Sequence, residues 1–302
     1  MSDSPGVRLR LLMDKACVPM PGAFNALCGR AIAKAGFDAC YISGAATSVS
    51  AGVPDVGLLS LEHFCRVIRE VADGSGLPVI ADADTGFGEE EMVRRTVIEY
   101  ARAGAADLHI EDQVFPKRCG HLDGKKLVPV DHMVEKVRAA AEAREALGNG
   151  FVVCARTDAR GVESFDAAVE RARAYVAAGA DMIFPEGLAS AEEFAKFAED
   201  MLPKAEACHP NRAAGRKPYL LANMTEFGKT PIIPLGEFAK MGYSCVIWPV
   251  TTLRAAMGEV TRILADLKRD GDVSGFVSRV QDRKGLYELL GYTPGVEWKF
   301  PG

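Results

Sequence analysis

Five consecutive residues bring a thiol together with basic side chains: Lys117, Arg118, Cys119, Gly120 and His121. An apolar run that ends in Glu111 precedes them, so we expect them on a loop that follows a strand. Neighbouring cations favour the thiolate form of a cysteine, and a thiol in such surroundings can also donate a proton in a reaction. A cysteine that only fills a hydrophobic core is surrounded by apolar side chains and does not need cationic neighbours. This loop is therefore the first candidate for chemistry.

A second set of polar residues stands where apolar runs end. Its members are Ser43, Gly44, Asp82, Asp84, Glu111, Asp112, Arg156, Asp158, Glu186, Asn223 and Thr225. Any one of them alone is more often a residue of a turn or a cap. In a barrel of parallel strands, however, such residues would all converge on the same mouth.

One recurring pattern predicts such a barrel. A helix-like segment that ends in Ala-Gly or Met-Gly precedes a short apolar run in KAGFDACYIS, RAGAADLHIED, AAGADMIFPEG and KMGYSCVIWP. The glycines at 36, 104, 179 and 242 are suited to end these helices. Further apolar runs at 18–21, 78–84, 151–158 and 219–223 bring the expected strands to eight. Amphipathic spacing predicts helices at 25–35, 89–103, 131–147, 165–178 and 251–268.

We therefore predict an α/β fold, a (β/α)8 TIM-type barrel over residues 1–270 with a helical extension at 271–302. An open doubly wound sheet is the alternative. Such a sheet more often carries a glycine-rich phosphate turn after its first strand, and the PGAFN turn at 21–25 is not one.

The composition excludes several classes of protein. The chain has 302 residues, 48% of them hydrophobic and 25% charged, which suits a globular protein rather than a disordered one. Its net charge of -5 comes from interspersed charges of both signs, so we expect no nucleic-acid partner. The sequence shows no signal-like or membrane-spanning apolar stretch, and its eight cysteines form no CxxC motif. We expect a cytoplasmic protein with reduced thiols and no membrane partner.

Three carboxylates at the ends of neighbouring strands indicate a metal site. Asp82, Asp84 and Glu111 offer hard oxygen ligands, which suit Mg²⁺. His109 would share the inward face with Glu111, so Mn²⁺ is an alternative ion. Such an ion can chelate a 2-hydroxy or 2-keto carboxylate and stabilise an enolate.

Arg156 and Glu186 have complementary uses beside such an ion. The arginine would bind a substrate carboxylate, and the glutamate would organise a hydrogen bond. A structural ion pair between the two is the alternative interpretation.

Several motifs together resemble the isocitrate lyase and phosphoenolpyruvate mutase superfamily. They are KRCGH after a strand that ends in HIEDQ, DADTGFG at 82–88, YISGAA at 41–46, ARTDAR at 155–160, FPEG at 184–187 and NMTEFG at 223–228. They occur in order over nearly the whole chain, whose length is similar to that of the short members. Within that branch the chain resembles methylisocitrate lyases most, followed by 2,3-dimethylmalate lyases and oxaloacetate-cleaving enzymes.

The resemblance implies an activity and a role for each matching residue. The activity is Mg-dependent retro-aldol cleavage of 2-methylisocitrate to pyruvate and succinate. Asp84 would bind Mg²⁺ directly, and Asp82 and Glu111 largely through water. Cys119 would be the general acid for the departing carbanion, and the other catalytic residues would be Tyr41, Arg156 and Glu186. Substrate contacts would come from Ser43, Gly44, Ala45, Asp55, Lys117, Arg118, Gly120, His121, Asn223, Thr225 and Arg254.

Other activities and an assembly also follow from the resemblance. Leu122 stands where several methylisocitrate lyases have arginine, so 2,3-dimethylmalate lyase and oxaloacetate hydrolase or decarboxylase remain alternatives. A carboxyphosphonate-type phosphonomutase and a non-catalytic keto-acid-binding barrel are further ones. The C-terminal stretch resembles a helix that family members exchange between subunits, which implies a homotetramer, with Trp298 and Phe300 as anchors.

Overall fold

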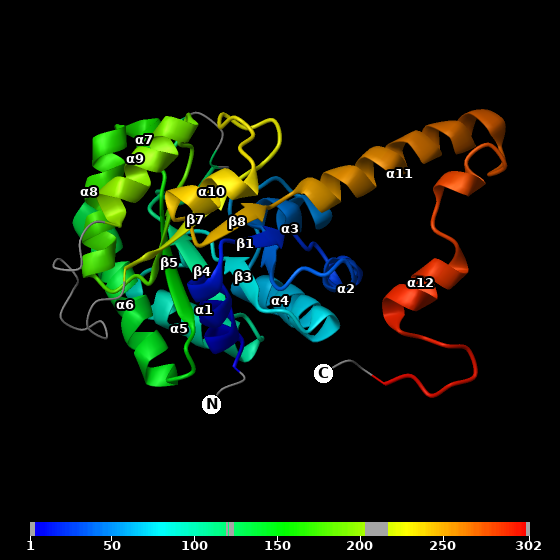
Figure 1. The fold of residues 1–302 in the computed structure, drawn as a ribbon, viewed down its shortest axis with the longest axis horizontal. Helices are drawn as coiled ribbons and strands as arrows, with labels where there is room; N and C mark the ends of the chain where they lie inside the picture. The colour runs from blue at the N-terminus through cyan, green and yellow to red at the C-terminus, as the bar shows by residue number, and fades with distance from the viewer. Residues whose placement is uncertain (1–3, 119, 121–123, 203–216, 300–302) are drawn as a thin grey trace.

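A ring of strands lies inside a layer of helices (Figure 1). The computed structural model describes residues 4–118, 120, 124–202 and 217–299. Within these residues, the strands are β1 (Val18–Pro21), β2 (Cys40–Ile42), β3 (Val79–Asp82), β4 (Asp107–Glu111), β5 (Val152–Thr157), β6 (Met182–Pro185), β7 (Tyr219–Asn223) and β8 (Cys245–Trp248). They pair in parallel in the order β1-β8-β7-β6-β5-β4-β3-β2.

The two edge strands of this order meet and close the ring. A parallel bridge joins Gly22 to Tyr41, and the N–H of Ala23 donates to the carbonyl of Tyr41 over 2.7 Å. The predicted (β/α)8 barrel is therefore confirmed, and the open doubly wound sheet is wrong. All eight strands lie where the apolar runs predicted them.

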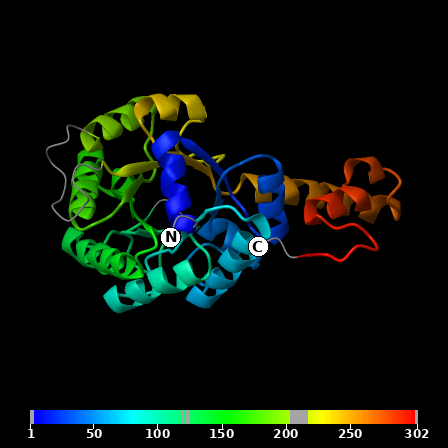
Figure 2. The same cartoon turned by 60° about the horizontal axis from the view of Figure 1, so that its bottom comes forward.

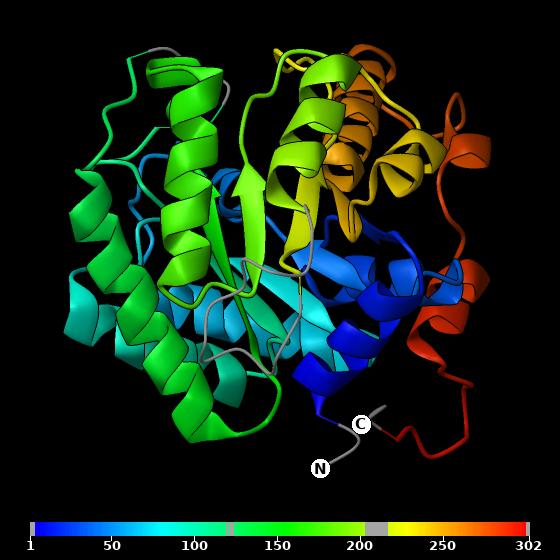
Figure 3. The same cartoon turned by 60° about the vertical axis from the view of Figure 1, so that its left-hand side comes forward.

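Helices separate the strands along the chain. They are α1 (Pro5–Lys15), α2 (Ala26–Lys34), α3 (Gly44–Ser50), α4 (Leu61–Ser75), α5 (Glu90–Arg102), α6 (Val130–Leu147), α7 (Ala159–Val162), α8 (Phe165–Ala177), α9 (Ala191–Met201), α10 (Leu235–Met241), α11 (Thr251–Asp270) and α12 (Arg283–Leu290), with a short 3-10 helix at Val277–Arg279. Several begin at an N-cap side chain that accepts the N–H three residues on: Asn25, Ser60, Ser164 and Ser190. The glycines expected to end helices, at 36, 104, 179 and 242, all have positive φ. Figure 3 shows α6 and α8 in front of the strands.

Alternation along each strand separates the barrel interior from the outer core. In β4, Leu108 and Ile110 pack outward against the helices. His109 points inward, where its ring contacts the rings of Tyr41 and Phe184. Because successive side chains of a strand face opposite sides, Asp107 and Glu111 share the inward face with His109. The inward positions near the carboxyl ends of the strands are thus available for a site.

The helix α1, which the sequence patterns did not predict, lies at the amino-terminal end of the barrel. Leu9 and Met13 of α1 are buried in the same apolar cluster as Val152 and Met182 of the strands. The helix therefore fills the end of the barrel opposite to the strand ends that carry the polar residues.

The last long helix, α11, leaves the barrel instead of covering it (Figures 1 and 2). A helix was predicted at 251–268, and that prediction is confirmed. Its exposed residues include four apolar ones at helical spacing, Met257, Val260, Leu264 and Leu267. On the barrel, an apolar groove between α2, α10 and the strands β1 and β8 is lined by Pro19, Pro21, Cys28, Ala31, Ile32, Ala35, Phe37, Leu235, Trp248, Thr251 and Thr252.

The C-terminal segment after α11 returns toward α2. Arg30 of α2 donates to the carbonyl of Leu290 over 3.2 Å, and its guanidinium lies 5.7 Å from the ring centre of Trp298. Trp298 also donates to Leu290 over 2.9 Å. Phe300, the other expected anchor, lies outside the described residues. No helix in the described part of the chain is long and apolar enough to cross a membrane.

Candidate active site

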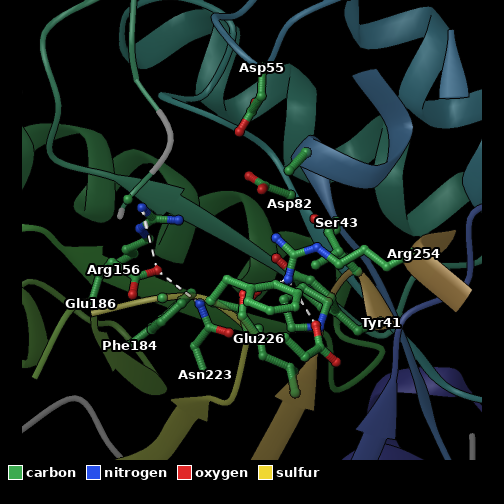
Figure 4. Close-up of a pocket in the computed structure, with 18 of the residues that line it drawn as sticks. Tyr41, Ser43, Asp55, Asp82, Arg156, Phe184, Glu186, Asn223, Glu226 and Arg254 are labelled. Carbon is green, nitrogen blue, oxygen red and sulfur yellow. Dashed lines mark hydrogen bonds and ion pairs between the residues drawn. The ribbon is translucent and has the colours of Figure 1, made fainter. Parts of the chain in front are cut away.

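Most of the predicted site residues line one pocket at the carboxyl ends of the strands (Figure 4). Those that line it are Tyr41, Ser43, Ala45, Asp55, Asp82, Lys117, Gly120, Arg156, Glu186, Asn223, Thr225 and Arg254. Figure 4 shows Arg156, Glu186 and Asn223 on one side and Tyr41 and Arg254 on the other. The convergence expected from the strand-end positions therefore occurs.

Other predicted residues lie beside the pocket or outside the described part of the chain. The N–H of Gly44 donates to Asp82 Oδ2 over 3.0 Å, so Gly44 fixes a residue of the pocket wall. The side chain of Arg118 is directed toward Gly124, and its backbone N–H donates to Gln113 Oε1 over 2.9 Å. Cys119 and His121 lie outside the described residues, so their roles stay predictions.

Arg156 is the centre of a buried group of charges. Its guanidinium makes two hydrogen bonds to Asp158, of 3.0 and 3.1 Å, and ion pairs with Glu111 at 3.3 Å and Glu186 at 3.6 Å. Its Cζ also lies 5.1 Å from the ring centre of Phe184. Burial alone would lower the pKa of Arg156, but the carboxylates raise it well above its ordinary value. A fixed and permanently charged guanidinium can bind a substrate carboxylate.

Glu186 is in turn held by Asn223. The amide Nδ2 of Asn223 donates to Glu186 Oε2 over 3.1 Å. The predicted ion pair between Arg156 and Glu186 exists, and both side chains line the pocket. The pair therefore does not exclude substrate contact, and the two interpretations of these residues are compatible.

Lys117 lies among the acids of the site. Its Nζ ion pairs with Asp55, 62 residues earlier, and with Asp84 Oδ1 at 2.7 Å. Burial opposes the charge of Lys117, but the carboxylates of Glu111, Asp82, Asp84 and Asp55 raise its pKa above the ordinary value. The charged form of Asp84 is disfavoured, because burial and the neighbouring Asp82 raise its pKa to about 6. The acids of the site therefore require a cation among them.

Some buried oxygens of these acids lack a hydrogen bond, although Lys117 and Arg156 lie at ion-pair distance, and they fit a divalent cation with oxygen ligands. Both carboxylate oxygens of Glu111 and the Oδ1 of Asp84 are buried without a hydrogen bond. Within the described residues, no three His, Cys, Asp or Glu side chains lie close enough together to share an ion directly. Buried carboxylate oxygens at such separations are compatible with an ion that keeps part of its water, as Mg²⁺ usually does.

A hydrogen bond links Tyr41 to His109 at the bottom of the pocket. The distance between Tyr41 Oη and His109 Nε2 is 2.7 Å, and the rings stack at 5.8 Å. Burial lowers the pKa of His109 to about 4 and raises that of Tyr41 well above its ordinary value. Both side chains are therefore neutral at pH 7. His109, which made Mn²⁺ an alternative ion in the sequence, orients the Tyr41 hydroxyl.

The sequence patterns missed a second wall of the pocket, formed by Glu226, Phe227 and Gly228. Arg254 donates to the carbonyl of Glu226 over 2.5 Å and to its Oε2 over 2.9 Å. Its guanidinium also lies 5.4 Å from the ring centre of Phe227, a non-glycine residue with φ of 60°. These residues belong to the NMTEFG motif, which supplied only Asn223 and Thr225 to the predicted site. The positive φ of Phe227 could not be predicted from the sequence, because non-glycine residues rarely adopt it.

Barrel and pocket together define a TIM-type barrel with a charged pocket at the carboxyl ends of its strands, the usual place of an active site in this fold. The family described as phosphoenolpyruvate phosphomutase matches residues 9–268. The Corynebacterium glutamicum protein named "Probable 2-methylisocitrate lyase 2" is 50% identical over 90% of this chain and 83% of its own length. The 2-methylisocitrate lyase of Aeropyrum pernix is 45% identical over 96% and 88%.

A solved structure of 2,3-dimethylmalate lyase is also similar, with a TM-score of 0.85 and 36% identity over 95% of this chain and 92% of that one. The chain belongs to the phosphoenolpyruvate mutase and isocitrate lyase superfamily, which confirms the resemblance. Its similarity to these relatives identifies it as a carbon–carbon lyase.

Proposed function

We propose that this lyase cleaves 2-methylisocitrate to pyruvate and succinate with the help of Mg²⁺. The observation that carries the proposal is the combination of 45–50% identity to proteins named 2-methylisocitrate lyase with the charged pocket. Arg156 and Arg254 offer two separate cationic positions in this pocket, which suits a substrate with several carboxylates.

Asp84 would hold Mg²⁺, with Asp82 and Glu111 contributing through water. When bound, the ion would stabilise negative charge on the oxygens of the 2-keto acid product. Ser43, Gly44 and Ala45 would contact the part of the substrate that becomes pyruvate. Their place at the start of α3, beside Asp82, supports this assignment.

Cleavage requires one proton to leave the substrate and another to return. A base removes the proton of the C2 hydroxyl, the C2–C3 bond breaks, and the C2–O bond becomes the carbonyl of pyruvate. The electron pair of the broken bond passes to C3, which is stabilised by its carboxylate. Cys119 then donates a proton to C3 and completes succinate.

The neighbour of Cys119 supports its assignment as the general acid. A Cβ at Gly120 would lie 2.4 Å from Arg156 Nη2, so the backbone of Gly120 lies against Arg156. We expect Cys119→Ser to abolish turnover while Mg²⁺ and pyruvate still bind. Joint loss of activity and of pyruvate binding would mean that the thiol is structural.

The similarity to 2,3-dimethylmalate lyase supports a second candidate substrate. A panel of 2-methylisocitrate, isocitrate, 2,3-dimethylmalate and oxaloacetate with Mg²⁺ separates the candidates through release of pyruvate, glyoxylate or oxalate. We expect the highest kcat/KM for 2-methylisocitrate. A higher value for another member would transfer the proposal to that substrate, and phosphonomutase activity would require a phosphonate substrate instead.

The assembly and location are proposals too. The projecting α11 with its apolar stripe, and the apolar groove on the barrel, support exchange of this helix between subunits of a homotetramer. The described cysteines Cys17, Cys28, Cys40, Cys65, Cys154 and Cys245 are all free, which supports a reducing compartment such as the cytoplasm.

A further inference from the structure

Lys125 is a buried lysine beside the pocket that the expected site does not include. Its side chain is only 5% exposed. Its Nζ donates to the carbonyl of Gly120 and to Asp158 Oδ1, the latter over 2.6 Å. Lysine is rarely buried unless its charge is paired, so both contacts are needed to keep this side chain inside.

Asp158 connects Lys125 to Arg156. Its two carboxylate oxygens accept from Arg156 Nε over 3.0 Å and from Nη2 over 3.1 Å. Its backbone N–H donates to Asp112 Oδ1 over 3.0 Å, and Asp112 is itself held by Thr157 at 2.7 Å. Asp158 is therefore fixed. Because it accepts hydrogen bonds from both Lys125 and Arg156, it fixes the Arg156 guanidinium relative to the Lys125 ammonium group.

Gly120 completes a closed set of contacts. A Cβ there would lie 2.4 Å from Arg156 Nη2 and 2.7 Å from Glu186 Cγ. Lys125 thus contacts Gly120 directly and is connected to Arg156 through Asp158. Gly120 itself lies against Arg156, so the four residues form a closed set of contacts. It also offsets the charge of Asp158, which leaves more of the Arg156 charge for a substrate.

We infer that Lys125 is a positioning residue that fixes Arg156 and the Gly120 backbone relative to each other in the pocket. The inference rests on the proposed function, since Arg156 is expected to bind a substrate carboxylate. Lys125 is absent from the pocket wall and acts through its neighbours.

The adjacent Lys126 provides a matched control. It is exposed, and within the described residues its side chain makes no hydrogen bond or ion pair. We expect Lys125→Met to lower kcat/KM for 2-methylisocitrate with Mg²⁺ at least tenfold, Lys125→Arg to restore part of it, and Lys126→Met to leave it unchanged. Amide hydrogen exchange in a peptide spanning 113–128, measured without substrate, should be faster in Lys125→Met than in Lys126→Met.

The two readouts separate this inference from the proposed function. If the wild type cleaves 2-methylisocitrate while Lys125→Met and Lys126→Met have equal kcat/KM and equal amide exchange, that result would overturn the inference on Lys125 but not the proposed function. Faster exchange in Lys125→Met with no cleavage by the wild type would overturn the proposed function alone. A Lys125→Met protein that does not fold, or a Lys125→Arg protein as inactive as Lys125→Met despite a normal Tm and normal exchange, would also contradict the positioning role.

Discussion

Gly120 touches Arg156 and Glu186 so closely that no side chain fits between them. A Cβ would approach Arg156 Nη2 to 2.4 Å, well inside van der Waals contact. We therefore expect Gly120→Ala to lower kcat/KM about tenfold or more, with a Tm close to that of the wild type. Gly236→Ala is the control, because nothing lies within 4 Å of its added Cβ. Equal activity of the two variants would mean that the backbone at 120 does not set the geometry of the site.

Asp107, at the opposite end of the barrel, is fully buried, and neither of its carboxylate oxygens has a hydrogen bond. Burial raises its pKa well above the ordinary value, with a further rise from Asp181. Well below pH 4, both the folded and unfolded states carry the proton. As pH rises above that, the unfolded state loses the proton first, so this residue lowers the free energy of unfolding.

Asp107→Asn removes the titrating carboxyl group and with it this pH dependence of the free energy of unfolding. We expect its free energy of unfolding, relative to the wild type, to increase between pH 4 and pH 8 in urea titrations. Asp181→Asn is the contrast, because Asp181 ion pairs with Arg10 at 3.1 Å and Arg144 at 2.5 Å, and its loss should destabilise at pH 7. A constant difference between Asp107→Asn and the wild type across this range would contradict the raised pKa.

The residue types at strand ends predicted most of the pocket, but not the contacts within it. Alternation along a strand already places Glu111 and Arg156 inside a barrel. It cannot show that Lys117 pairs with Asp55, 62 positions away, because that contact depends on how two loops fold over the mouth. Nor can it distinguish Lys125 from Lys126, which are identical in type and adjacent in the chain.

At the scale of elements, the apolar runs predicted every strand because strands covered on both sides are continuously apolar. Two helices behaved differently from the expected pattern. The helix α1 was not predicted, because the open end of the barrel that buries it is formed by distant segments and leaves no local pattern in the sequence. The helix α11 was predicted, but the pattern of its own segment does not predict that it leaves the barrel.

The role of α1 in closing the barrel leads to a stability prediction. Leu9 is fully buried in the interior cluster, whereas Leu11 of the same helix is 51% exposed. We expect Leu9→Ala to cost about 2–5 kcal/mol of unfolding free energy, and Leu11→Ala less than about 1 kcal/mol. Urea unfolding followed by circular dichroism measures both. Similar losses in the two variants would mean that α1 does not seal the interior.

At the scale of the whole molecule, the apolar stripe of α11 and the groove on the barrel are complementary in chemistry. We expect a homotetramer of 32.4-kDa chains in sedimentation equilibrium. Leu264→Asp, in the middle of the stripe, should shift the protein to smaller species, because an unpaired charge is costly in an apolar interface. Arg262→Asp, off the stripe, should leave the assembly intact. A wild-type monomer, or identical behaviour of the two variants, would contradict helix exchange.

We propose that the pocket cleaves 2-methylisocitrate between C2 and C3 with the aid of a divalent ion. The most direct measurement is proton NMR of 2-methylisocitrate incubated with the purified protein in Mg²⁺, and again after removal of metal with EDTA. We expect pyruvate and succinate to appear in equal amounts with Mg²⁺, to stop appearing with EDTA, and to return when Mg²⁺ is restored. Unchanged 2-methylisocitrate in the presence of Mg²⁺, or cleavage that EDTA does not affect, would contradict the claim.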